Sequence, residues 1–199
     1  MDLTQGTEKE KNARSKKMML WFGIGSLIMS FSALISAFIV SSKQRKDKDW
    51  LLNYELPDAF LVSVGVILLS SLTFILAKKA LKNNDIKMTT IWLLVTLVLG
   101  IGFVYSQFEG FNQIISNGYN FTGPTSNITM SYIYLIAIVH IGHVIAGLLS
   151  IIVVIYNHFK QKYNPNNMLG LELAANFWHF VDLLWLVLFL FLYFFRDII

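Results

Sequence analysis

The side chains of this sequence best suited to chemistry lie inside long apolar segments. His179 and Asp182 are three residues apart within the apolar stretch 176–195. Residues with that spacing share one side of a helix, with Cβ atoms about 5–6 Å apart. An imidazole beside a carboxyl group suits either a hydrogen bond that fixes a helix interface or the relay of a proton. The residue types support both interpretations, and the spacing does not separate them.

Two tryptophans lie on the same helical row as the aspartate. Trp178, Asp182 and Trp185 follow the i, i+4, i+7 pattern, so the carboxyl group is expected between two indole rings. Indole N–H groups are hydrogen-bond donors, and we expect them to support the His179–Asp182 pair. An isolated aspartate near the membrane centre costs about 3 kcal/mol on insertion. The apolar residues 183–195 offset that cost, but the pair must still face protein rather than lipid.

A second apolar segment carries His140, His143 and Gly147 on one helical face. Two imidazoles in a membrane span suggest a haem or metal site, and a bis-histidine haem would need His179 as the ligand from a second helix. The alternative is that the histidines stay neutral and bond to neighbouring helices, with Gly147 allowing close contact. The chain has no cysteine, which excludes thiolate ligands and disulfides.

Five apolar runs of membrane-spanning length must position these side chains. Hydrophobic residues make up 55% of the 199 residues and charged residues only 14%, far fewer charges than in soluble domains. We therefore predict an all-α, polytopic membrane bundle with a solvated N-terminal tail, residues 1–17, and a single five-helix transmembrane domain, residues 18–196. The expected spans are residues 18–40, 57–77, 88–108, 128–156 and 173–195.

The basic residues lie between the apolar runs or in the N-terminal tail. Eleven Lys and Arg fall on one side of the expected membrane and five on the other, which predicts a cytoplasmic N-terminus and an external C-terminus. Topology thus explains the net charge of +4, and no nucleic-acid binding is expected. The first span also carries a stripe of small residues that would allow tight packing against a neighbouring helix: Ser26, Ser30, Ala33 and Ala37.

The string GLELAANFWHFVDLLWLVLF, residues 170–189, resembles the signature of subunit III of haem–copper respiratory oxidases, cytochrome c oxidase in particular. The matching residues in this stretch are Gly170, Glu172, Trp178, His179, Phe180, Val181, Asp182 and Trp185. The preceding segments resemble the same family through His140, His143, Val144 and Gly147, through Thr96, Gly100, Phe103 and Gln107, and through Pro57, Ser70 and Ser71. The resemblance spans residues 18–196 and corresponds to the last five helices of the family's seven-helix form.

This resemblance implies an accessory subunit that packs directly on the catalytic subunit I, beside subunit II and small subunits, in a bacterial inner membrane. The complex reduces oxygen to water and pumps protons. Subunit III itself is expected to hold no haem, copper or active site, to stabilise subunit I and to support proton uptake. The resemblance also implies bound structural phospholipid, no metal at the histidines, and an architectural role for His179 and Asp182.

Several alternatives remain open at this stage. The electron donor is either cytochrome c or a quinol, and membership of a larger respiratory supercomplex is undetermined. A more distant hypothesis is a haem-b membrane anchor or electron carrier that uses His140 or His143 with His179. Leu27 stands where the family usually has an acidic residue, so that carboxylate's role is not expected here. Lys160 and Lys162, by position, are the expected partners of a lipid phosphate.

Overall fold

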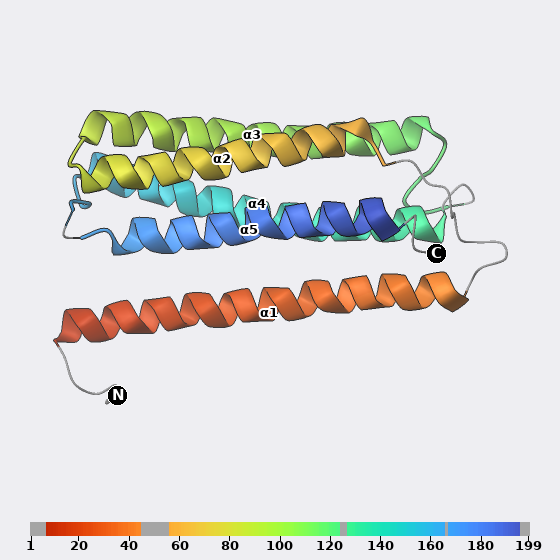
Figure 1. Ribbon diagram of the computed structural model, residues 1–199, viewed down its shortest axis with the longest axis horizontal. Helices are drawn as coiled ribbons and strands as arrows, with labels where there is room; N and C mark the ends of the chain where they lie inside the picture. The colour runs from red at the N-terminus through yellow and green to blue at the C-terminus, as the bar shows by residue number, and fades with distance from the viewer. Residues whose placement is uncertain (1–6, 45–55, 124–126, 166, 196–199) are drawn as a thin grey trace.

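Five α-helices follow one another along the chain in the computed structural model (Figure 1). The structure describes residues 7–44, 56–123, 127–165 and 167–195. The helices are α1 (Glu8–Gln44), α2 (Asp58–Lys82), α3 (Ile86–Ser116), α4 (Ile128–Phe159) and α5 (Leu169–Phe195). Each is long and apolar enough to cross a membrane. The predicted all-α fold with five transmembrane helices is confirmed.

The helices extend past the spans expected from hydropathy. α3, for example, has 31 residues, whereas about 20 are enough to cross the hydrocarbon core. Helical hydrogen bonding therefore continues into the polar ends of the apolar runs. The charged end of the last span at Arg196 lies outside the described residues, as does most of the loop between the first two spans.

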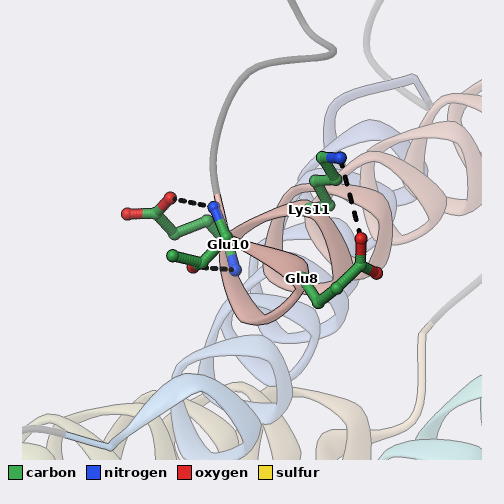
Figure 2. Close-up of polar contacts among 4 residues, drawn as sticks. Glu8, Glu10 and Lys11 are labelled. Atoms are coloured by element: carbon green, nitrogen blue, oxygen red, sulfur yellow. Dashed lines mark hydrogen bonds and ion pairs between the residues drawn. The ribbon is translucent and has the colours of Figure 1, made fainter.

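The first helix begins well before its apolar run. Thr7 and Glu10 form a capping box, in which Glu10 Oε2 accepts from the Thr7 N–H at 2.9 Å and Thr7 Oγ1 accepts from the Glu10 N–H at 3.4 Å (Figure 2). Glu8 and Lys11 add an exposed ion pair at 3.7 Å. The described part of the expected solvated tail, residues 7–17, is largely exposed, and from Glu8 onward it is helical.

Helices α2 to α5 enclose the core, each with its backbone close to two of the others, and their buried residues are spaced alternately three and four apart. On α3 these buried residues are Thr89, Leu93, Thr96, Gly100, Phe103, Gln107, Gly110 and Ile114. The same alternation runs along α5, whose buried residues include Leu171, Trp178, Trp185 and Leu192. Such seven-residue repeats are typical of helix bundles with a slight left-handed supercoil. A step of seven residues therefore returns to the same seam of the bundle.

Helix α1 lies apart from this group (Figure 1) and, among the described helices, contacts only α4 and α5. Its buried apolar residues are Ile24, Phe31 and Phe38, again seven residues apart. The hydroxyl groups of Ser41 and Tyr132 join α1 to α4 at 2.8 Å.

The small-residue stripe of α1 faces away from the other described helices. All four of its members are exposed: Ser26, Ser30, Ala33 and Ala37. The two serine hydroxyls bond to carbonyl groups of their own helix. Packing of this stripe against a neighbouring helix is therefore not made within the described part of the chain.

Candidate functional site

The indole ring of Trp178 fills the centre of the four-helix core. The side chain is fully buried, and its Nε1 donates to Ser70 Oγ on α2 at 3.1 Å. Its ring lies directly against Gly100 of α3 and Gly147 of α4, where an added Cβ would come within 2.8 Å of a ring carbon. One side chain of α5 therefore contacts three other helices, and the close contact expected at Gly147 is confirmed.

Trp185 repeats this arrangement two turns further along α5. Its Nε1 donates to Ser63 Oγ at 3.0 Å, and Ser63 lies seven residues before Ser70 on α2. The indole stacks on the imidazole of His140 from α4, with ring centroids 4.9 Å apart. We call the two bonds Trp178–Ser70 and Trp185–Ser63 the Trp–Ser ladder. The ladder joins α5 to α2 along the seam where α3 and α4 also meet them.

His179 bonds to α2 rather than to Asp182. Its Nδ1 lies 2.6 Å from Ser71 Oγ, and its ring packs on Phe74. Asp182 is buried, and neither carboxyl oxygen has a hydrogen-bond partner among the described residues. The expected hydrogen bond between His179 and Asp182 is therefore wrong, because α2 supplies the partner of His179.

The expected role of the two indole N–H groups is also wrong. Both were expected to donate to the His179–Asp182 pair, but both donate to serines of α2. The two acceptors, Ser70 and Ser63, lie seven residues apart on α2, which matches the spacing of the two indoles on α5. The expectation that Trp178, Asp182 and Trp185 share one buried face is confirmed.

His140 and His143 of α4 were expected to bond to neighbouring helices, but no such bond is found among the described residues. His140 is buried, and neither ring nitrogen has a hydrogen-bond partner among the described residues. Its ring is instead enclosed by Trp185, Phe31 and Phe103. His143 Nδ1 donates to the carbonyl of Val139 in its own helix at 2.7 Å. Aromatic packing, rather than hydrogen bonding, therefore holds His140 at the interface.

Gln107 and Glu172, two further residues of the expected site, are polar side chains within the helix bundle. Gln107 is buried on α3, seven residues after Gly100, and its amide atoms have no hydrogen-bond partner in the described structure. Glu172 of α5 pairs with Lys78 of α2 at 3.9 Å. Both side chains of that pair are about one-third exposed, so the pair adds little stability.

The two lysines expected to meet a lipid phosphate lie at the far end of α4. Lys160 is exposed and sits 4.5 Å from the centroid of the Tyr156 ring. Lys162 lines an open groove of about 790 Å³ between α1, α4 and α5. Lys16 of α1 lines the same groove. The two lysines therefore face different surroundings.

Sequence reasoning singled out Ser70 only as a residue matching the family, and it did not identify Ser63 or Ser70 as the acceptors of the indole bonds. Ser63 and Ser70 have the same seven-residue spacing as the two tryptophans, and this matching was the available signal. It also missed His158, whose Nε2 lies 3.0 Å from Thr90 Oγ1 and joins α4 to α3.

Comparison with known proteins places this architecture in a family. A model of the family described as cytochrome c oxidase subunit III matches residues 51–197, most of the chain. The chain belongs to the cytochrome c oxidase subunit III family. The family resemblance inferred from the sequence motifs is confirmed.

Relatives of both donor types are similar to this subunit III. It is 28% identical to cytochrome c oxidase subunit 3 of Bacillus sp. (strain PS3), over 92% of this chain and 89% of the relative. It is 29% identical to cytochrome bo(3) ubiquinol oxidase subunit 3 of Buchnera aphidicola subsp. Baizongia pistaciae, over 94% and 95%. Quinol oxidase subunit 3 of Bacillus spizizenii is 27% identical, over 91% and 87%.

These similarities extend over nearly the whole length of each protein. The chain is therefore subunit III of a haem–copper terminal oxidase, of the cytochrome c or the quinol type. With five helices able to cross a membrane, it is a multi-pass protein of the bacterial inner membrane. As subunit III, it is part of a complex with other oxidase subunits.

Proposed function

We propose that this subunit III is an architectural element that packs on catalytic subunit I, stabilises it during turnover and supports proton uptake. The observation that carries the proposal is the Trp–Ser ladder. The rare side chains of the α5 signature bond and pack within the bundle, with Trp178 touching three other helices. We favour cytochrome c as the electron donor of the complex, with a quinol as the alternative.

In this proposal haem and copper belong to the partner subunits. A bis-histidine haem needs two imidazoles that face each other across a porphyrin. His179 contacts Ser71 and Phe74 of α2, whereas His140 is enclosed by Trp185 and two phenylalanines. The two rings therefore point to different parts of the bundle. Their surroundings favour packing over the haem-b anchor hypothesis.

The proposed orientation has a cytoplasmic N-terminus and an external C-terminus. The start of α1, the α2–α3 turn and the α4–α5 connection lie at the same end of the bundle (Figure 1). These segments, together with the helix ends that adjoin them, carry eleven of the sixteen Lys and Arg residues. A concentration of basic residues at one end favours the cytoplasmic side.

Structural phospholipid is the ligand proposed for this end of the subunit. The groove between α1, α4 and α5 is lined by apolar residues such as Leu20, Val153 and Phe177 and also by Lys16 and Lys162. An acyl chain fits apolar walls, and a phosphate group suits the lysines at the membrane surface.

The assembled oxidase carrying Ser63→Ala and Ser70→Ala together tests the architectural role. Each substitution leaves a buried indole N–H without its acceptor, which costs about 1–3 kcal/mol. We expect an unchanged initial rate of oxygen consumption per haem, a faster decline of that rate during turnover, and loss of subunit III on purification. Assays with reduced cytochrome c and with quinol would identify the donor.

Ser106→Ala is the matched control, because the Ser106 hydroxyl donates to the Phe103 carbonyl of its own helix at 2.7 Å. It should leave both rate and retention at the wild-type level. A lower initial rate in the double variant, with subunit III fully retained, would show instead a direct part in the reaction.

A further inference from the structure

A surface recess between α2 and α5 opens beside His179. The recess has a volume of about 420 Å³ and is lined by Ile75, Lys78, Lys79, Lys82, Ala175, Asn176 and His179. The three lysines belong to the last turns of α2, where the chain leaves the apolar region. Lysine ammonium groups are strongly hydrated, so water reaches this recess and with it one side of the imidazole ring.

The other side of His179 leads into the protein. Its Nδ1 is 2.6 Å from Ser71 Oγ. Asp182 follows His179 by three residues on α5, so its carboxyl group lies on the same side of the helix as the imidazole that Ser71 contacts. Asp182 is only 1% exposed, and its oxygens have no hydrogen-bond partner in the described residues. Side chains from two helices therefore run from a hydrated recess to a buried carboxyl group whose hydrogen-bonding capacity is unused.

We propose that His179 and Ser71 form a proton-exchange route between the recess and Asp182. An imidazole can accept a proton at one nitrogen while it donates from the other. Nε2 of His179 accepts a proton from water in the recess as Nδ1 passes its own proton to Ser71 Oγ. As the Ser71 hydroxyl accepts that proton, it gives its own proton to a carboxylate oxygen of Asp182, so that no charged serine is formed. Release follows the reverse order and restores the original tautomer of His179.

The charged groups around the route make Asp182 the site that holds the proton. Lys78, Lys79 and Lys82 line the recess and repel positive charge on the imidazole, and Glu172 offsets only Lys78. On the inner side the ring meets neutral groups of α2, the Ser71 hydroxyl and the Phe74 ring.

On the side of α4, the titratable group that packs against α5 is His140. His140 stacks on Trp185, one helical turn beyond Asp182. No described cation pairs with the carboxyl group. A proton therefore passes through His179 and resides on Asp182. This inference concerns the chain itself and does not rest on the proposed function in the oxidase.

Infrared spectroscopy of the full chain in lipid bilayers tests the route. The C=O stretch of the protonated carboxyl group is followed as the pH is lowered, and the band that disappears in Asp182→Asn belongs to Asp182. On transfer to D2O this band shifts as the proton is replaced by deuterium. We expect the Asp182 proton to exchange for deuterium quickly in the wild type. In Ser71→Ala and in His179→Phe this exchange should be slower by on the order of 100-fold.

Two matched variants separate the route from general damage. Ser70→Ala removes the neighbouring serine, which bonds to Trp178 instead of His179, and should exchange at the wild-type rate. Ser71→Thr keeps a hydroxyl group and should also exchange quickly. Wild-type exchange in both Ser71→Ala and His179→Phe would overturn the proposal. So would the absence of an Asp182 band at every pH at which the chain stays folded.

Discussion

Trp178→Ala is expected to lower the free energy of unfolding of this subunit by about 3–5 kcal/mol. The indole is fully buried against α2, α3 and α4, and glycines at positions 100 and 147 shape the space that it fills. Removal of the ring leaves a cavity that the three helices cannot close without moving their backbones. Thermal unfolding of the purified full chain in detergent, followed by circular dichroism, measures the loss.

Trp21→Ala is the control for the loss of an indole ring. Trp21 lies on α1 and is 63% exposed, so its removal should change the free energy of unfolding by no more than about 0.5 kcal/mol. If the two variants lost equal free energy of unfolding, burial of Trp178 among the helices would not contribute to stability.

Gly147→Leu tests the same contact from the opposite side, by overfilling it. A Cβ at this position would already lie 2.8 Å from a carbon of the Trp178 ring, and leucine adds three more carbons. Overpacking typically costs about 1–3 kcal/mol. We expect a loss of unfolding free energy at the upper end of that range, because the bond to Ser70 and the contact with Gly100 prevent the indole from moving aside. Thermal unfolding of the full chain again measures it.

Gly142→Leu is the matched control on the same helix, because nothing lies within 4 Å of a Cβ added there. It should unfold at nearly the wild-type temperature. The variant that combines Gly147→Leu with Trp178→Ala should lose less than the sum of the two single losses, since leucine then occupies part of the vacated space. Equal stability of Gly147→Leu and Gly142→Leu would contradict the close contact.

The number and type of the helices could be predicted from the sequence, because a bilayer demands about 20 apolar residues per span. The helix ends could not be predicted from hydropathy. Thr7 and Glu10 signal the start of α1 as a capping box, but by hydropathy alone they look like part of a solvated tail. Local hydrogen bonding, rather than membrane thickness, decides where α1 begins.

For the candidate site, the sequence predicted which residues share a helix face but not which residues they contact. Helical periodicity showed that Trp178, Asp182 and Trp185 share a face, and they do. Periodicity within one helix says nothing about which residues of another helix meet that face. Ser63 and Ser70 become informative only once α2 is known to lie beside α5, and neither the bond to His179 nor the lack of one at Asp182 follows from spacing.

A double-mutant cycle between Ser70→Ala and Trp178→Phe tests most directly the claim that indole–serine bonds hold α5 in the bundle. Phenylalanine keeps an aromatic ring but removes the N–H that donates to Ser70 Oγ. The bond predicts a coupling free energy of about 0.5–1.5 kcal/mol, so the double variant should be less destabilised than the sum of the single variants. Strictly additive losses would contradict the account.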